Sequence, residues 1–315
     1  MADVRTNIFG IGEVYELQRE GLWVEKNRES YREFGYFGSG TTTGSPGSGL
    51  SIVDRIDYSN DTATAGVRGS LTVGSYRPGA TGNSNFGYFR VVSTSRVDYS
   101  NDTSTALSRN SIPGAYGSAA TENSNFGYFG GGPSSSIFRL NYSNDIATAL
   151  TRGPLSGGTY VIAATGNSNF GYFGGGNSSG STKSIVSRVD YSNDISTASV
   201  RSALSLTKFV LAATGNSNFG YFGGGKTPAV VSTVDRIDYS NDTATASVRG
   251  PLSLGRDELA ATGNSNFGYF GGGSPGSRST VDRIDYSNDT ATASVRGPLS
   301  LARDNLAATT NARNS

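Results

Sequence analysis

The stretch NSNFGYFGGG, residues 264–273, joins an aromatic strand to a run of glycines and recurs in close copies along the chain. Its Phe-Gly-Tyr-Phe core begins at Phe34, Phe86, Phe126, Phe170, Phe219 and Phe267. Each copy is followed by a Tyr-Ser-Asn-Asp motif, whose tyrosines are Tyr58, Tyr99, Tyr142, Tyr191, Tyr239 and Tyr286. A repeat of about 40 to 50 residues is the sequence signature of a β-propeller or a solenoid.

One full repeat divides into four short segments that we expect to be strands. In chain order, the segments that supply strands a to d are LAATGN (259–264), NFGYFGGG (266–273), STVDRIDYSND (279–289) and TATASVRGPLS (290–300). Within the last two, VDRIDY (281–286) and TATASV (290–295) alternate in side-chain character with the period of two that marks a strand. Between them, Tyr-Ser-Asn-Asp has the composition of a turn. Four strands per repeat predict a propeller blade.

The two ends of the chain predict how the ring closes. The repeats begin at Phe34 with strand b, and the chain ends in a strand a sequence, LARDNLAATTNARNS (301–315). Pairing residues 305–309 into the first blade would complete it and remove both open sheet edges. We therefore predict an all-β, six-bladed propeller with four-stranded blades over residues 34–315. The alternative is an open solenoid, which needs polar capping repeats that the sequence does not display.

Composition narrows the possible chemistry. The 315 residues contain no histidine and no cysteine, which removes the commonest general base and all thiolate metal sites. Twenty-six basic residues balance twenty-five acidic ones, so charge gives no reason to expect nucleic acid as a partner. The opening MADVRTNIFG (1–10) lacks the pattern of a secretory signal, so we expect none, and no apolar run in the sequence is long enough to span a bilayer. We expect no catalysis, no cofactor, no metal and no membrane insertion.

The repeats predict one constant and one variable face. The a–b and c–d junctions, near-identical in all copies, share the constant face, and the divergent b–c and d–a loops share the variable face. Diversity confined to one face of a rigid scaffold is typical of a binding surface, although unconstrained loops also vary. Aligning the d–a loops on strand a gives six candidate ligand-binding residues: Tyr76, Tyr116, Tyr160, Phe209, Asp257 and Asp304. Aromatic rings edged with carboxylates suit a carbohydrate; the alternative is packing between blades.

Two other patterns invite a functional interpretation. The oxygens of Asp57-x-Ser59-x-Asp61 could hold calcium, but the pattern lacks the glycine and the acidic closing residue of an EF-hand loop, so we interpret it as a hairpin turn. Arginines recur at one position of strand d, and a sialidase uses clustered arginines. Their repetition on the outer strand favours a solvated or packing role. These arginines are Arg68, Arg109, Arg152, Arg201, Arg249 and Arg296.

Residues 1–33 stand outside the repeats and form a second expected region. GEVYELQRE (12–20) is predicted to be a short helix with Gly21 as its C-cap. Its apolar side would need a covering surface, either the propeller's own base or a partner protein, and we favour a partner. The candidate attachment residues are Ile11, Val14, Tyr15, Leu22 and Trp23.

The order of motifs resembles the kelch repeat. That family ends strand b in a double glycine, carries a valine and a tyrosine on strand c, and places a basic residue before strand a. The matching residues are Gly271 to Gly273, Val281, Tyr286, and Arg256 or Arg303. The strand d tryptophan of that family is missing here, and the turn aspartates follow Ser-Asn rather than the tyrosine. The resemblance therefore implies the fold and not an inherited function.

The whole chain, from its IGEVYELQ opening (11–18) through the repeats, resembles virion proteins of marine tailed phages, particularly those that infect cyanobacteria. The resemblance implies a tail- or fibre-associated structural protein, assembled in the host cytoplasm and attached to other virion proteins through its N-terminal segment. The propeller would face outward for recognition of the host surface or a glycan. The alternatives are a neck or capsid decoration protein without a ligand and, less favoured, a glycan-active enzyme.

Overall fold

The computed structural model describes residues 32–312 except 91–92, 114–116 and 133. The chain from Glu33 onward forms one compact unit. The predicted N-terminal helix and the attachment residues Ile11, Val14, Tyr15, Leu22 and Trp23 lie outside the described residues, and so does Tyr116.

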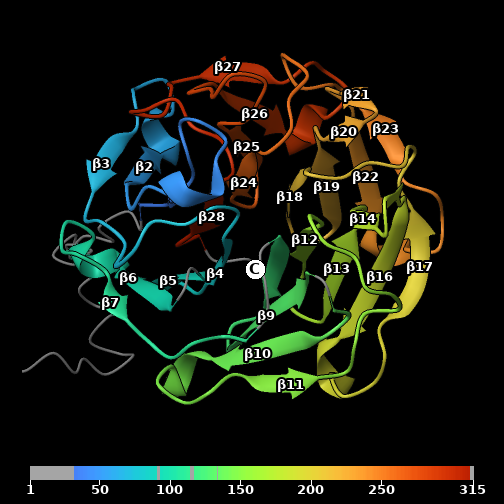
Figure 1. The fold of residues 1–315 in the computed structure, drawn as a ribbon. Helices are drawn as coiled ribbons and strands as arrows, with labels where there is room; N and C mark the ends of the chain where they lie inside the picture. The colour runs from blue at the N-terminus through green and yellow to red at the C-terminus, as the bar shows by residue number, and fades with distance from the viewer. Residues whose placement is uncertain (1–31, 91–92, 114–116, 133, 313–315) are drawn as a thin grey trace, which may run out of the picture. The chain divides into compact units, whose positions relative to one another are not determined.

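The described chain folds into six four-stranded antiparallel sheets set radially around a central channel (Figure 1). This confirms the predicted all-β, six-bladed propeller. Blade 1 has the strand order β28-β1-β2-β3, and blades 2 to 6 follow in chain order, with short hairpins added to blades 4 and 5 on the variable face.

The strand bounds repeat from blade to blade. The inner a strands are β28 (Ala307–Thr310), β4 (Gly79–Gly82), β8 (Ser118–Glu122), β12 (Ala163–Gly166), β18 (Ala212–Gly215) and β24 (Ala260–Gly263). The b strands are β1 (Phe34–Gly38), β5 (Phe86–Arg90), β9 (Phe126–Gly131), β13 (Phe170–Gly174), β19 (Phe219–Gly223) and β25 (Phe267–Gly271). The c strands are β2 (Val53–Asp57), β6 (Thr94–Asp98), β10 (Ile137–Asn141), β16 (Ile185–Asp190), β22 (Val234–Asp238) and β26 (Val281–Asp285). The outer d strands are β3 (Gly66–Arg68), β7 (Leu107–Ser108), β11 (Leu150–Arg152), β17 (Ser199–Ala203), β23 (Ser247–Arg249) and β27 (Ser294–Arg296).

The remaining elements are short. The added hairpins are β14 (Asn177–Ser178) with β15 (Ser181–Thr182), and β20 (Lys226–Thr227) with β21 (Ala229–Val230). The 3-10 turns are η1 (Pro46–Ser48), η2 (Tyr58–Asn60), η3 (Tyr99–Asn101), η4 (Tyr142–Asn144), η5 (Tyr191–Asn193), η6 (Tyr239–Asn241) and η7 (Tyr286–Asn288).

The C-terminal strand closes the ring as predicted. β28 pairs with β1 in antiparallel register, and Phe37 lies opposite Ala308. The strand occupies Ala307–Thr310 rather than 305–309. Asn305 has a left-handed backbone conformation (φ 55°), which does not fit a strand, so the strand begins only after it. The amide of Phe34 donates to Asn311 Oδ1 (2.6 Å), as the amide of Phe86 donates to Asn83 Oδ1 (2.9 Å) within the covalent a–b turn of blade 2. The closure thus reproduces a normal turn without a peptide connection.

The outer strand is the element whose position differs most from the prediction. Residues 290–293 form a turn and an extended connection, and β27 covers only Ser294–Arg296. The amide of Ala291 donates to Asn288 O within the turn, and the amide of Ala293 donates to Pro251 O of the preceding blade. The alternation of threonine and alanine in this segment therefore reflects contacts with the neighbouring blade, and not hydrogen bonding between strands of one sheet.

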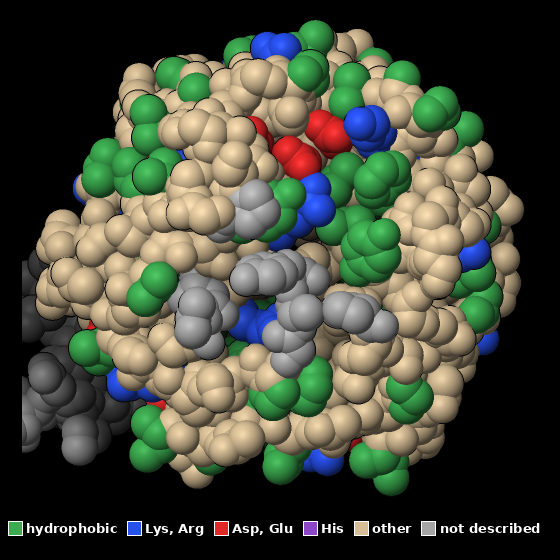
Figure 2. Space-filling view, in the orientation of Figure 1, with side chains coloured by type: hydrophobic (Ala, Val, Ile, Leu, Met, Phe, Trp, Pro, Cys, Tyr) green, Lys and Arg blue, Asp and Glu red, His purple; other side chains and the backbone are tan. Residues whose placement is uncertain are grey.

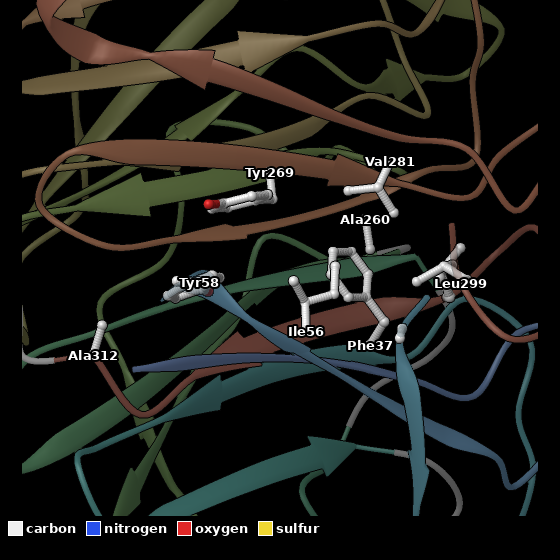
Figure 3. Close-up of a cluster of buried hydrophobic side chains, with 10 residues drawn as sticks. Phe37, Ile56, Tyr58, Ala260, Tyr269, Val281, Leu299 and Ala312 are labelled. Carbon is white, nitrogen blue, oxygen red and sulfur yellow. The ribbon is translucent and has the colours of Figure 1, made fainter. Parts of the chain in front are cut away.

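The hydrophobic core lies between blades. Tyr269 and Phe270 at the end of the repeated motif are fully buried, and their equivalents in the other blades are equally buried. In the cluster that joins blades 6 and 1, Phe37, Ile56 and Tyr58 pack against Tyr269 and Val281 (Figure 3). Because both faces of each sheet contact a neighbouring blade, a c strand buries side chains on either face, as Val281 and Asp282 of β26 show.

The glycine of Phe-Gly-Tyr-Phe has a steric explanation. A Cβ atom on Gly268 would lie 2.7 Å from both the hydroxyl oxygen of Tyr286 and Cγ2 of Thr214. Tyr286 and Thr214 share a hydrogen bond (3.4 Å) across the blade interface. The glycine therefore leaves room for a tyrosine from its own blade to reach a threonine of the preceding one.

Candidate functional site

Each blade is fastened to the next by an aspartate that we call the latch aspartate, the last residue of Tyr-Ser-Asn-Asp. Between blades 6 and 1, Asp61 Oδ2 accepts hydrogen bonds from the hydroxyl of Tyr269 (2.8 Å) and from Arg283 Nη1 (2.7 Å). Arg296 on the outer strand lies 3.5 Å from the same oxygen. The described chain repeats the tyrosine–latch aspartate bond at Tyr36–Asp102, Tyr88–Asp145, Tyr128–Asp194, Tyr172–Asp242 and Tyr221–Asp289.

The latch gives the strand d arginines and the Asp-Ser-Asp pattern structural roles. All six recurrent arginines form ion pairs with latch aspartates at 2.9 to 3.5 Å. In the same motif, Asp57 Oδ1 accepts from the amide and the hydroxyl of Ser59 (3.0 and 2.6 Å), while Asp61 is engaged with Tyr269. The two carboxylates therefore do not converge, which favours the hairpin-turn interpretation. No cluster of three or more acidic, histidine or cysteine side chains that could hold a metal occurs in the described part of the chain.

The chain enters and leaves the propeller on the constant face. β1 begins there at Phe34, next to Asn311 at the end of β28. A hollow of about 480 Å³ opens on this face, and asparagine and serine side chains of the a–b junctions line part of it. The variable face is therefore the face opposite to the chain ends of the described unit.

The central channel is narrow and lined by alanines and threonines of the a strands, with about 80 Å³ of enclosed space. The threonines share hydrogen bonds with tyrosines of the next blade, as in the pair Thr81 and Tyr142 (2.8 Å). Glu122 is the one carboxylate among the described residues that line this cavity. It accepts a hydrogen bond from Thr81 Oγ1 (2.9 Å), and burial raises its pKa to about 7.

A closed ring of backbone hydrogen bonds surrounds the channel on the variable face. Within the described residues it has six members, which we call the mouth ring: Arg77, Gly117, Val161, Val210, Glu258 and Asn305. Each amide donates to the carbonyl of the member from the preceding blade, at 2.8 to 3.5 Å. All six have positive φ angles, including the β-branched Val161 (54°) and Val210 (50°). Left-handed conformations are unfavourable for valine, so the ring holds strained backbone at the mouth.

The side chains of the mouth ring divide it into two halves. On one side, Arg77 pairs with Glu258, and Arg77 Nε donates to Asn305 Oδ1 (2.7 Å). On the other side, Val161 and Val210 present apolar side chains. A depression of about 80 Å³ lies between the two halves. Acidic, basic and hydrophobic side chains gather beside the centre of this face (Figure 2).

The predicted ligand residues immediately precede the mouth ring. Four of them form antiparallel backbone bridges to b–c loops, in the pairs Tyr160–Asn177, Phe209–Lys226, Asp257–Ser274 and Asp304–Thr41. Tyr160 is 39% exposed and Phe209 is partly exposed.

The side chains at three other predicted positions are less exposed than a ring of ligand-binding residues around the mouth would need to be. Tyr76 stacks on the guanidinium group of Arg77 (4.9 Å from its ring centroid). Asp257 and Asp304 are buried, at 7% and 3% exposure. The Asp304 carboxylate accepts hydrogen bonds from Thr41 and Ser277 and is therefore not open to a ligand, whereas Asp257 exposes a small part of its side chain.

Sequence reasoning missed a set of buried ion pairs beneath this face. Lys208, Arg256 and Arg303 are each fully buried directly before a predicted ligand residue. They pair with strand c aspartates of the same blade: Lys208–Asp235 (3.0 Å), Arg256–Asp282 (2.7 Å) and Arg303–Asp54 (2.9 Å). The sequence contains a signal for these pairs, which is that the basic residue and the aspartate occur together or not at all. The repeats without the basic residue have Ser95, Phe138 or Ser187 in place of the aspartate. Through these ion pairs, Arg256 and Arg303 anchor the d–a loops to strand c of their own blades.

No protein-family model matches the chain, and no curated protein matches it. No helix in the described part is both long and apolar enough to cross a membrane.

Proposed function

We propose that this chain is a phage virion structural protein, tail- or fibre-associated, that displays a kelch-like propeller for recognition of the host surface. The observation that carries the proposal is the contrast between the two faces. The latch and the a–b junctions repeat in every blade, whereas the mouth ring has five different residue types at its six positions. Such a contrast is typical of a rigid scaffold that presents a specific surface. The resemblance of the whole chain to phage virion proteins supplies the biological setting.

The position of the chain ends supports this orientation. Because Phe34 and Asn311 meet on the constant face, a particle attached through residues 1–33 would leave the variable face free. Other virion proteins would be the partners of that segment, and the virion would be the location of the assembled protein.

The proposed role is binding and not catalysis. The sequence contains no histidine or cysteine, and the strand d arginines that a sialidase-like site would need are paired with latch aspartates.

A second candidate is a neck or capsid decoration protein without a ligand. The specific observation in its favour is that the polar half of the mouth is internally paired, since Arg77, Glu258 and Asn305 bond one another. A surface whose polar groups satisfy each other leaves fewer of them for a ligand.

Two experiments test the proposal. Immunogold labelling of phage particles from lysed cultures tests the virion location, which absence from particles would refute. Binding of the fluorescent full chain to host cells tests recognition. The double variant Tyr160→Ala with Phe209→Ala should lose binding at least tenfold. The matched control, Leu107→Ala with Val200→Ala, removes two side chains of 52% and 55% exposure on the outer strands and should bind normally. Absence of cell binding by the wild-type chain would favour the decoration role, and equal binding by both variants would place the contact surface away from Tyr160 and Phe209.

A further inference from the structure

Asp257 and Asp304 occupy equivalent positions before neighbouring blades but have different surroundings. The Asp304 carboxylate accepts hydrogen bonds from Thr41 Oγ1 (2.5 Å), Ser277 Oγ (2.9 Å) and Asn305 Nδ2 (2.9 Å). Asp257 is 7% exposed, and among the described residues its carboxylate accepts a hydrogen bond only from its own backbone amide. Neither of its oxygens is both buried and without a partner. A carboxylate can accept up to four hydrogen bonds, so Asp257 keeps acceptor positions that the donors of a ligand can fill.

The charges around Asp257 indicate what kind of ligand fits. Burial, with a smaller contribution from Glu258, raises the pKa of Asp257 to about 6, so the group is mainly an ionised acceptor at neutral pH. Lys226 and Arg77 act on it in the opposite direction. Two cations therefore balance two carboxylates at this place. A balanced set of charges favours a neutral hydrogen-bond donor over a strongly charged ligand.

An aromatic residue lies one step round the mouth ring from these charges. The amide of Glu258, which follows Asp257, donates to the carbonyl of Val210, which follows Phe209 (2.9 Å). Phe209 occupies the position equivalent to Asp257 before the preceding blade, and its ring is partly exposed. Two backbone hydrogen bonds hold Phe209 beside Lys226. The amide of Phe209 donates to the carbonyl of Lys226 (3.3 Å), and the amide of Lys226 donates to the carbonyl of Phe209 (3.0 Å). The ammonium group of Lys226 belongs to an exposed side chain. An aromatic face next to an acceptor and a donor matches a sugar ring, which has an apolar C–H face and hydroxyl groups at its edge.

We propose that Phe209, Lys226 and Asp257 form a subsite for a neutral saccharide residue on the variable face. The sugar stacks on Phe209, its hydroxyl groups donate to the Asp257 carboxylate, and Lys226 donates to a sugar oxygen. The inference rests on the proposed function and narrows it to a ligand class and to one sector of the face, between blades 5 and 6. Tyr76 and Asp304 are not part of this subsite. Tyr76 stacks on Arg77, and the Asp304 carboxylate accepts hydrogen bonds from Thr41 and Ser277.

Saturation-transfer NMR on the full chain tests the subsite, with glucose, galactose, mannose, fucose and N-acetylglucosamine as probes. At least one sugar should bind with a millimolar Kd. Asp257→Asn and Phe209→Ala should each weaken that binding at least tenfold, and Lys226→Ala should weaken it to a smaller extent. The matched control is Leu254→Ala, which removes an exposed apolar side chain (43%) from the loop that carries Asp257 and should leave binding unchanged. Thermal unfolding of every variant verifies that it is folded, and the exposed Lys226 provides a variant that cannot fail through lost core packing.

The outcomes separate the two proposals. Cell binding by a wild-type chain that binds none of the sugars would overturn the saccharide subsite and leave the recognition role standing. Failure to bind either cells or sugars would overturn both. Sugar binding that survives Asp257→Asn, Phe209→Ala and Lys226→Ala would also overturn the subsite, because the sugar would then occupy another place.

Discussion

The hydroxyl of Tyr269 in the last blade lies 2.8 Å from the Asp61 carboxylate in the first, so the ring is closed by the same latch that joins every other pair of blades. Tyr269 and the turn residue Tyr58 of blade 1 also stack, with ring centroids 4.8 Å apart. The closing interface therefore has the same polar and aromatic contacts as the interfaces within the chain. It differs in that strand a of blade 1 arrives from the C-terminus and in that Asn264 Nδ2 donates to the Glu33 carboxylate (2.9 Å).

Removing the latch hydroxyl at the closing interface should destabilise the propeller. Tyr269→Phe should lower the free energy of unfolding by about 1.5 to 3 kcal/mol, because the ring packing is retained and one hydrogen bond to a charged group is lost. Urea unfolding measures the change. Tyr160→Phe, at an exposed position, should have no effect, and an equal effect of the two substitutions would contradict the role of the latch.

The two aspartates of one turn should differ in their contribution to stability. Asp61→Ala should cost about 3 to 5 kcal/mol, because it leaves Arg283 and Arg296 without their buried partner. Asp57→Ala should cost about 1 kcal/mol, since Asp57 caps an exposed 3-10 turn. Guanidinium unfolding of both variants provides the comparison, and similar losses would refute the assignment of Asp61 as the latch.

Substitution of the repeated glycine tests the steric argument for the motif. Gly268→Ala should cost several kcal/mol, about 2 to 4, because its methyl group would displace Tyr286 or Thr214. Gly157→Ala is the matched control, since a Cβ there meets nothing within 4 Å. The difference in thermal midpoint between the two variants is the measurement. Equal midpoints would show that the Tyr286–Thr214 contact does not require glycine.

Glu122 should make stability depend on pH. Its pKa in the folded protein is about 7, above the ordinary value of 4.5, so the folded state binds the proton more tightly than the unfolded state. The contribution of Glu122 to the free energy of unfolding is therefore most favourable below pH 4.5, and it is lost as the pH rises through 7. Glu122→Gln should remove this dependence and stabilise the protein at pH 8.5 by about 2 kcal/mol, less than the full shift because solvent reaches part of the side chain.

The measurement is the urea midpoint of wild type and Glu122→Gln at pH 5 and at pH 8.5. The gain should be larger at the higher pH. Glu122→Gly, which introduces the residue found at this position as Gly82, Gly166, Gly215 and Gly263, should give the same sign. A gain confined to pH 5 would contradict the assignment.

The sequence by itself determined the number of blades, their four-strand pattern and the closure by the C-terminal strand. It could do so because these properties follow from local periodicity and from repetition at a fixed spacing. It also indicated which loops share the variable face. The outer strands were located only within a longer segment, because residues such as Ala293 bond to a neighbouring blade. A local pattern does not distinguish that partner from a strand of the same sheet.

Only the tertiary structure decided which polar side chains are already engaged. Tyr36 and Asp102 are 66 residues apart, and neither motif indicates by itself that the two side chains are bonded. The bond follows only from the placement of neighbouring blades side by side. Asp257 and Asp304 look alike in the sequence, yet Asp304 is surrounded by donors and Asp257 is not. The physical reason is that hydrogen bonding and desolvation depend on the neighbours that the fold brings within about 3 Å, which in this propeller come from other repeats.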